Sequence, residues 1–255
     1  MLADRFRLDG KVAIITGSGK GIGQAIGFAF AEAGAKVVFS ARTESDILAN
    51  AERAKSLGAQ ALAVPCDVRN DDQLQSLVAR TVEAWGKIDI VVNNAGGAMP
   101  NQIARTSRRR FNEAFDFNVT SALMVVRYSL PYLQKSKGCV INICSAAGRI
   151  VQPNFSVYGT VKAALIHMTR LMASDLAPDV RVNGIAPGSI LTDALKGLLD
   201  EPSLKKMCER TPMKRLGEVD DIALAAVYLA SPAAGWVTGK ILEIDGGMEA
   251  TNMPS

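Results

Sequence analysis

Short apolar runs rich in valine and isoleucine alternate with longer helical patterns along almost the whole chain. The expected strands, several of which run on into a loop, are KVAIIT, KVVFSA, QALAVPCDV, KIDIVVNNAG, GCVINICS, DVRVNGIAPG and GKILEIDGG. Parallel strands need a crossover of a dozen or more residues, which is usually a helix. The alternation therefore predicts βαβ units, right-handed crossovers and a doubly wound α/β fold with a parallel sheet.

The helical patterns fill the intervals between these runs. They are expected at 21–34, 45–58, 71–86, 107–136, 156–176 and 219–231, with a broken helical stretch at 192–212. The chain has 255 residues, of which 48% are hydrophobic and 5% aromatic. This is enough for one substantial α/β domain or two small ones. Because no linker or low-complexity tract interrupts the pattern, we expect a single domain over residues 1–255.

The charge and cysteine content argue against several classes of protein. The net charge is only +4, and the one basic run, Arg108 to Arg110, is typical of a solvated helix face, so we expect no nucleic-acid partner. The four cysteines, at 66, 139, 144 and 208, show no CxxC spacing and are expected to be reduced thiols without a metal. The N-terminus MLADRFRLDG lacks an apolar signal core, and no run of about 18 apolar residues predicts a membrane span. We therefore expect a cytoplasmic protein.

One expected helix carries a phenol and an ammonium one turn apart. In SVYGTVKAALIHMTRLMASDL, Tyr158 and Lys162 are four residues apart and share a helix face. Their neighbours are small or apolar, so both groups must face a partner or a cavity if that face is buried. A tyrosine at a helix end beside a solvated lysine is the alternative, since short matches of this kind are common.

The first strand leads into a glycine-rich loop, TGSGKGIG, that opens the first helix. Gly17, Gly21 and Gly23 have GxxxGxG spacing, and Ser18, Lys20 and Ile22 lie between them. Glycines at this place let the backbone approach a pyrophosphate at the N-terminus of the helix, where free N–H groups favour anions. The loop is thus a candidate dinucleotide site, although a simple glycine-rich turn would show the same composition.

The second strand ends with FSARTES and indicates which dinucleotide is bound. An NAD enzyme usually has an acidic residue here for the ribose hydroxyls, whereas this chain has Ala41 followed by Arg42. An arginine can hold a 2′-phosphate through its planar guanidinium, and Lys20 adds a second positive charge. The sequence therefore favours NADP(H), with NAD(H) as the less favoured alternative and a plain surface charge as the other interpretation of Arg42.

The remaining strand ends also carry candidate binding groups. Because ligands of such sheets bind beyond the carboxyl ends of the strands, we expect these groups to converge. Ser145 follows the fifth strand. The candidate cofactor contacts are Asp67 and Val68 for the adenine, Asn94, Ala95 and Gly96 for the adenosine side, and Pro187, Gly188, Ile190 and Thr192 for the nicotinamide.

Taken together, these motifs resemble the short-chain dehydrogenase/reductase family, whose members have a Rossmann fold. The resemblance runs from RLDGKVAIITG to LEIDGG and includes TGSGKGIG, NNAG, Asn118, Ser145, YGTVK and the PG pair at 187–188. More narrowly, RVNGIAPGSILTDALK and SPAAGWVTGKILEIDGG resemble the bacterial 7α-hydroxysteroid dehydrogenase branch. The best-known steroid members carry an acidic residue at the second strand end, where this chain has Ala41 and Arg42.

The resemblance implies a catalytic set of four residues. Tyr158 would protonate a carbonyl oxygen as hydride arrives, or act as the base in the reverse direction. Lys162 would favour the phenolate and hold the nicotinamide ribose. Ser145 would polarise the substrate oxygen, and Asn118 would anchor a water chain that carries protons to the lysine. No metal is implied.

The resemblance also implies a substrate lid and an assembly. The lid would span about 191–212, where several leucines and Met207 suit an apolar ketone or alcohol, although an amphipathic surface helix is an equal alternative. The assembly would be a homotetramer, with the Tyr158 helix and the 107–136 helix at one dimer contact.

Three functions remain open at this point. The leading one is an NADP(H)-dependent oxidoreductase acting on an apolar cyclic or steroid-like substrate. A 3-oxoacyl-thioester reductase would use the same chemistry, but Phe155 and Val157 stand where such enzymes often have polar residues before the tyrosine. A nucleotide-binding sensor is the non-enzyme alternative, which the intact Asn118, Ser145, Tyr158 and Lys162 set disfavours.

Overall fold

The strands of the protein form one parallel sheet. The computed structural model describes residues 1–253, within which the sheet has seven strands in the order β3-β2-β1-β4-β5-β6-β7. Each neighbouring pair is parallel. The strands are β1 (Val12–Thr16), β2 (Lys36–Ser40), β3 (Ala61–Ala63), β4 (Ile90–Asn93), β5 (Cys139–Ile143), β6 (Arg181–Pro187) and β7 (Ile241–Ile244). The predicted α/β fold is therefore confirmed.

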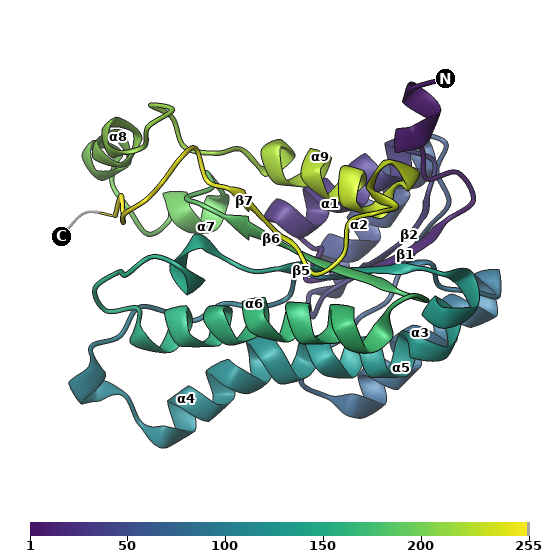
Figure 1. Cartoon of the computed structure of the whole chain (residues 1–255), viewed down its shortest axis with the longest axis horizontal. Coiled ribbons are helices and arrows are strands. Elements are labelled where there is room, and N and C mark those ends of the chain that lie inside the picture. The colour runs from purple at the N-terminus through teal and green to yellow at the C-terminus, as the bar shows by residue number, and fades with distance from the viewer. Residues whose placement is uncertain (254–255) are drawn as a thin grey trace.

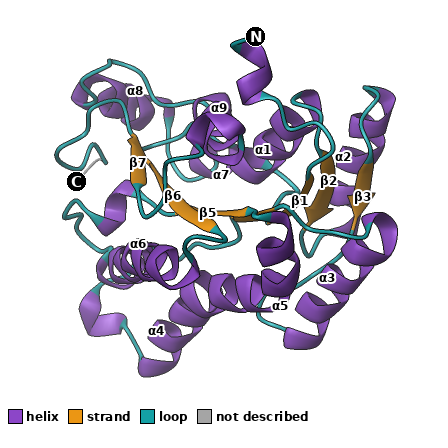
Figure 2. Cartoon of the chain, turned by 45° about the vertical axis from the view of Figure 1, so that its right-hand side comes forward, coloured by secondary structure: helices purple, strands orange, loops and turns teal. Residues whose placement is uncertain are grey.

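Helices cover both faces of this sheet (Figure 1). One face packs on α1 (Gly21–Glu32), α2 (Glu44–Ser56) and α9 (Val219–Ala230), and the other on α3 (Asp71–Trp85), α5 (Ser121–Ser136) and α6 (Ser156–Leu176). The shorter helices are α4 (Arg108–Phe115), α7 (Asp193–Lys196) and α8 (Glu201–Arg210). Figure 2 shows the sheet as the middle layer between the two helix layers. None of the helices between residues 1 and 253 is long and apolar enough to cross a bilayer.

The strands are apolar on both sides because both of their faces are buried. In β1, Ala13 and Ile15 point into the core beneath α1, while Ile14 points into the core above α3 and α5. All five residues of β1 and of β5 are buried. This accounts for the continuous apolar runs in the sequence, since strands with one solvated face would alternate with polar residues.

Two elements differ from the sequence-based expectation. The strand expected over 60–68 is regular only at 61–63, and Pro65 follows at the edge of the sheet, where no neighbouring strand needs its N–H. The chain nevertheless stays beside β2, where Val64 and Cys66 donate to the carbonyls of Phe39 and Ala41 at 3.0 and 3.1 Å. The helix expected over 107–136 is interrupted by a π-helical turn at Asp116–Thr120.

The strand order places a binding crevice at the carboxyl end of the sheet. From β1 the chain proceeds outward to β2 and β3, and then returns so that β4 pairs with the other side of β1. The segments that follow β1 and β4 therefore lead to helices on opposite faces of the sheet, α1 and α5. This is the switch point at which α/β sheets bind their ligands.

Candidate functional site

Three cavities lie along the carboxyl ends of the strands, and one of them, of about 570 Å³, lies over the ends of β6 and β7. Of the other two, the larger has a volume of about 550 Å³ and extends from the glycine loop to α7, and the smaller has about 290 Å³ and lies over the ends of β2 and β3. Both are lined by Lys20, Asn94 and Gly96. The two cavities therefore meet at the glycine loop, and together they form an elongated site.

Close packing shapes the glycine loop against the loop that follows β4. A Cβ on Gly17, whose φ is +63°, would lie 2.9 Å from the Cα of Ala95, and a Cβ on Gly23 would collide with the Asn94 amide. That amide donates to the carbonyls of Thr16 and Gly17 at 3.0 and 2.9 Å. Gly17 and Gly23 thus keep the two loops in contact.

Gly21 and Ser18 have different surroundings within the same loop. A Cβ on Gly21 would approach nothing nearer than Thr192 Cγ2, at 3.6 Å, so this glycine faces the larger cavity together with Ile22. Ser18 is buried and faces inward, where its hydroxyl donates to Ile15 O at 2.8 Å and accepts from Ser40 N at 2.7 Å. Ser18 therefore fastens the loop to β2.

The smaller cavity has charges of both signs on its wall. Arg42 is exposed there and has no carboxylate partner among residues 1–253. Lys20 Nζ lies 3.4 Å from Asp46 Oδ2. Glu44 is the first acidic residue after Arg42 in the sequence, but Asp46 lines the cavity because its position on the first turn of α2 faces Gly19.

Asp67 and Val68 line this cavity as the sequence suggested, yet the carboxylate already has a partner. Arg69 donates to both Asp67 oxygens, at 3.1 and 2.7 Å, and this holds the pKa of the Asp67 carboxyl below its ordinary value. An adenine amine would therefore share the carboxylate with a guanidinium.

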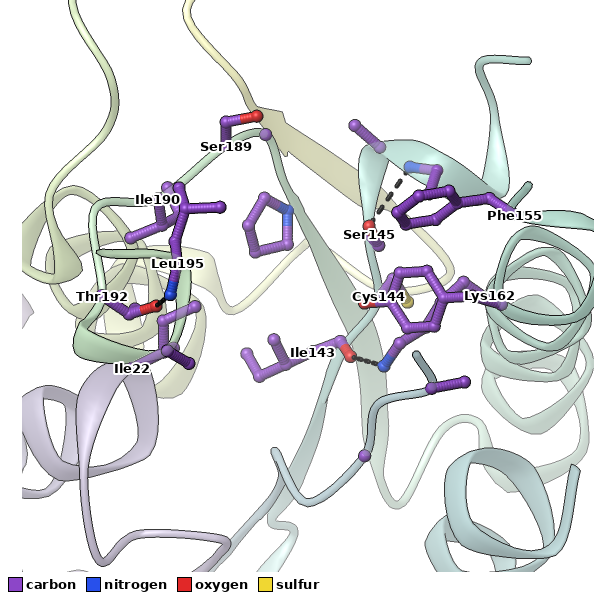
Figure 3. A pocket seen from close by; sticks show the side chains of 18 of the residues that line it. Ile22, Ile143, Cys144, Ser145, Phe155, Lys162, Ser189, Ile190, Thr192 and Leu195 are labelled. Carbon is purple, nitrogen blue, oxygen red and sulfur yellow. Dashed lines mark hydrogen bonds between the residues drawn. The ribbon is translucent and has the colours of Figure 1, made fainter. Parts of the chain in front are cut away.

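Three of the four candidate catalytic side chains line the larger cavity together. Ser145 follows β5, and Tyr158 and Lys162 come from the first turns of α6. Lys162 is buried, donates to the Ile143 carbonyl at 2.9 Å and lies 5.7 Å from the centre of the Tyr158 ring. Figure 3 shows Ser145, Phe155 and Lys162 on one side of the cavity.

The hydroxyl of Ser145 is available as a donor. It accepts a hydrogen bond from Ala147 N at 3.2 Å, which leaves its proton free. The Tyr158 ring is held by an edge-to-face contact with Phe155, with ring centres 5.9 Å apart. A carbonyl oxygen in this cavity can therefore meet two hydroxyl donors that are fixed by their surroundings.

Asn118 lies behind this group and within the π-helical turn. Its Oδ1 accepts from Gly97 N at 2.8 Å, and its Nδ2 donates to Gly97 O and Ala114 O at 3.0 and 2.8 Å. A Cβ on Gly96 would lie 2.7 Å from Asn118 Oδ1 and 3.2 Å from Lys162 Nζ. Asn118 thus holds the loop after β4 beside the lysine.

The opposite side of the cavity comes from the end of β6 and from α7. Pro187, Gly188, Ile190 and Thr192 all line it, and Thr192 caps α7 by accepting from Leu195 N at 3.3 Å. Figure 3 shows Ile190, Thr192 and Leu195 facing the Ser145 side across the cavity. Residues expected to flank a nicotinamide therefore lie opposite the candidate catalytic group.

Only the first part of the expected lid reaches the cavity. Leu195 and Leu198 line it, whereas Met207 of α8 is fully buried away from it. Sequence reasoning missed several apolar lining residues, namely Met99, Pro100, Ile150, Met248 and Met253, and also Gln152. Met248 and Met253 lie at the far end of the chain from the glycine loop, and no motif marks them.

Cys144 lines the cavity next to Ser145 but is poorly suited to act as a nucleophile. Burial raises the pKa of this thiol to about 11, so it is protonated at neutral pH. All four cysteines are free.

Comparison with known proteins gives a consistent result. A family model described as enoyl-(acyl carrier protein) reductase matches residues 17–249. A 7α-hydroxysteroid dehydrogenase of Escherichia coli is 44% identical over 252 residues, covering 96% of each chain. A 3-oxoacyl-[acyl-carrier-protein] reductase of Vibrio cholerae is 35% identical over 243 residues, covering 94% of this chain and 98% of the relative.

Solved structures agree over the same length. A 7α-hydroxysteroid dehydrogenase complexed with NADH and 7-oxo glycochenodeoxycholic acid matches with a TM-score of 0.93 at 42% identity, covering 96% of each chain. A gluconate 5-dehydrogenase of Burkholderia cenocepacia, in complex with NADP and tartrate, matches with a TM-score of 0.91 at 33% identity, covering 97% of this chain and 98% of the other. The family model and the relatives match nearly the whole chain at these identities. This chain is therefore an oxidoreductase and belongs to the short-chain dehydrogenase/reductase family.

Proposed function

We propose that this protein interconverts a ketone and a secondary alcohol with NADP(H), on an apolar cyclic or steroid-like substrate. The observation that carries the proposal is the placement of Ser145, Tyr158 and Lys162 on one largely apolar cavity. That cavity continues into a second one with Arg42 on its wall. Structural neighbours bound to NADH and to NADP support a nicotinamide cofactor.

The residues along the two cavities fit such a cofactor. Gly21 leaves open space at the N-terminus of α1, where a pyrophosphate would be favoured by the free N–H groups. Arg42, Asp67 and Val68 would hold the adenosine end, and the residues after β4 and β6 would flank the nicotinamide end. When bound, the nicotinamide group supplies or accepts the hydride.

The chain's own residues would handle the proton and the oxygen. The free O–H of Ser145 would donate to the substrate oxygen and stabilise the negative charge that develops on it. The Tyr158 hydroxyl would transfer its proton to that oxygen during reduction, and would take it back during oxidation. The Phe155 contact would keep the phenol oriented for this transfer.

Lys162 and Asn118 would support the tyrosine from behind. The Lys162 ammonium lies 5.7 Å from the centre of the Tyr158 ring and next to Gly96, where the nicotinamide ribose would pass. Asn118 would fix the loop that carries Gly96 and, as the family resemblance implies, anchor a water that returns protons to Lys162.

The wall of the larger cavity favours an apolar substrate. Its volume of about 550 Å³ lies within the range of roughly 300–1,000 Å³ found for sites that bind drug-sized ligands. Apolar side chains from four separate segments close it, namely Met99, Ile150, Phe155, Leu195, Leu198, Met248 and Met253. The segment at 191–212 would act as a lid through its α7 end.

We also propose a homotetramer. Leu123 on α5 and Leu171 on α6 are 45% and 53% exposed, on the two helices that the family resemblance places at a dimer contact. A dimer contact formed by these two helices would bury both leucines.

The proposed activity predicts a ranking of substrates. Purified protein with NADPH should give a higher kcat/KM for steroid-sized cyclic ketones than for cyclohexanone, because burial of apolar surface contributes roughly 25 cal/mol per Å². The measurement is NADPH oxidation across steroid ketones, small cyclic ketones and 3-oxoacyl thioesters. A clear preference for the thioesters would assign the protein to the acyl-carrier class, of which the Vibrio relative is an example. Absence of turnover with every ketone and thioester would contradict the proposal.

The positive charge of Arg42 on the wall of the smaller cavity predicts that the enzyme prefers NADPH to NADH. Ala41→Asp should shift the ratio of kcat/KM values toward NADH by about 10- to 100-fold, which corresponds to about 1.4–2.8 kcal/mol. The new carboxylate would accept from the ribose hydroxyls and repel a 2′-phosphate. Ala41→Asn, without the charge, is the matched control and should shift the ratio less. Wild-type enzyme that uses NADH better than NADPH would refute the interpretation of Arg42.

A further inference from the structure

The amide of Asn50 is a buried polar group that the proposed chemistry does not use. Asn50 lies on α2, is 5% exposed and lines neither the larger nor the smaller cavity. Its Nδ2 donates to the carbonyls of Ser18 and Gly19 at 3.0 and 2.9 Å. Both carbonyls belong to the glycine loop, so this side chain holds the loop from outside the two cavities.

A third hydrogen bond fixes which way the Asn50 amide points. Gln24, on α1, donates from Nε2 to Asn50 Oδ1 at 2.7 Å. An asparagine amide has two N–H donors on its nitrogen and an acceptor on its oxygen. Because Gln24 engages the oxygen, the two N–H donors face the carbonyls of the loop. The whole amide is therefore committed to holding the loop and the helix that the loop opens.

The same face of α2 makes further contacts with the loop. Asp46 precedes Asn50 by one helical turn and so lies on the same face of the helix. A Cβ on Gly19 would lie 3.3 Å from Asp46 Cβ, and Asp46 Oδ2 lies 3.4 Å from Lys20 Nζ. This face of α2 therefore packs directly on the loop, and Asn50 supplies the hydrogen bonds to its backbone.

These bonds decide which backbone groups the loop presents to a ligand. Both peptide units are trans, so the C=O and the N–H of each point in opposite directions. Holding the carbonyls of Ser18 and Gly19 toward α2 turns the N–H groups of Gly19 and Lys20 away from it. Within residues 1–253 neither N–H has an acceptor, and both residues line the smaller cavity. Successive free N–H groups of this kind bind phosphate oxygens.

The position of Gly19 makes such an anchor necessary. Gly19 is shared by the two peptide units, and a glycine has more backbone freedom than any other residue. Without a donor on α2, both units could rotate and turn a carbonyl oxygen toward a bound phosphate. A carbonyl oxygen carries partial negative charge and would repel the phosphate. The affinity of the loop for an anion therefore depends on a side chain that does not touch the anion.

We propose that Asn50 is a positioning residue for the cofactor, because it keeps the carbonyls of Ser18 and Gly19 turned away from the pyrophosphate. The inference rests on the proposed function and deepens it. NADPH and NADH share the pyrophosphate, so Asn50 should serve both cofactors equally. Arg42, in contrast, concerns only the 2′-phosphate of NADPH.

The test replaces the amide and measures cofactor binding directly. Asn50→Leu removes both donors and keeps a side chain of similar size. The dissociation constants of the folded variant for NADPH and for NADH, from fluorescence titrations without substrate, should each rise about tenfold, the scale of one hydrogen bond. The kcat at saturating NADPH with a cyclic ketone should stay within about twofold of wild type, because no group that meets the reacting carbonyl changes.

Two further variants separate positioning of the loop from support of the fold. Asn183→Leu is the matched control, since Asn183 is also a buried amide, and it donates to Val237 O at 2.8 Å and accepts from Lys240 N at 3.0 Å. It should lower the melting temperature and leave both dissociation constants unchanged. Asn50→Ala removes the same donors with a small side chain that suits a helix, and it should weaken both cofactors as Asn50→Leu does.

Each other outcome overturns the inference in a recognisable way. Wild-type affinity in folded Asn50→Ala would mean that the amide serves the fold alone, even if the melting temperature falls. Weaker binding of NADPH only would mean that the amide acts on the 2′-phosphate end. An equal loss of affinity in Asn183→Leu would mean that any loosening of the fold has this effect. Wild-type protein that binds neither NADPH nor NADH would instead contradict the proposed function itself.

Discussion

Replacement of Tyr158 by phenylalanine should lower kcat by roughly 10²-fold or more, the usual scale for a positioned general acid. The fold should persist, because phenylalanine keeps the ring that packs edge-to-face on Phe155. Only the hydroxyl that faces the cavity is lost, so cofactor affinity should change little. The measurements are steady-state turnover with NADPH and a cyclic ketone, and NADPH binding followed by fluorescence.

A matched control removes a phenol elsewhere. Tyr132 lies on α5 and packs against the core between that helix and the sheet, outside both cavities. Tyr132→Phe should therefore keep near wild-type kcat. Well-folded Tyr158→Phe protein with near-normal turnover would show that the proton comes from another group, and Ser145 would then be the next hydroxyl to examine.

The fold could be predicted from the sequence because its dominant signal is local. A strand buried on both faces must be apolar throughout, and the crossover to the next parallel strand must be long, so the order of elements is visible in the chain. Two elements differ from the sequence-based prediction, namely the third strand and the helix over 107–136. β3 ends at Ala63, two residues before Pro65, and the helical pattern over 107–136 does not reveal the π-helical turn that contains Asn118.

Part of the candidate site could also be predicted, because it depends on the order of the strands in the sequence. Strand ends converge at one edge of a parallel sheet, so the order of strands in the sequence is enough to group Ser145, Asn94 and Pro187. The rest depended on tertiary packing. Asp46 and Glu44 are two residues apart and so face different directions on α2, a distinction that composition does not reveal. Met248 and Met253 reach the cavity only through the path of the C-terminal segment.

The buried lysine predicts opposite effects on activity and on stability. Lys162 is 4% exposed, and no carboxylate among the described residues lies within ion-pair distance of it. An ammonium that is withdrawn from water without a counter-charge destabilises the folded state. Sites of this kind are a recognised source of the trade-off between stability and activity.

Lys162→Met should therefore raise the melting temperature of the cofactor-free protein while it lowers kcat/KM by roughly 10²-fold or more. A gain of about 1 kcal/mol would correspond to about 2–4 °C for a domain of this size. The Ile143 carbonyl loses its donor, but it lines the cavity and can be hydrated there, so little of that gain should be offset. Calorimetric unfolding and steady-state turnover measure the two effects.

The matched control replaces a lysine whose ammonium is exposed instead of buried. Lys135→Met removes an exposed ammonium from α5 and should change neither quantity appreciably. A lower melting temperature for Lys162→Met would mean that the bond to Ile143 holds the end of β5 in place, and that Lys162 serves the fold. Retained activity would mean that the phenol of Tyr158 functions without the cation. The combination of a more stable and nearly inactive protein is expected only if the lysine is kept at the expense of stability for the chemistry of the cavity.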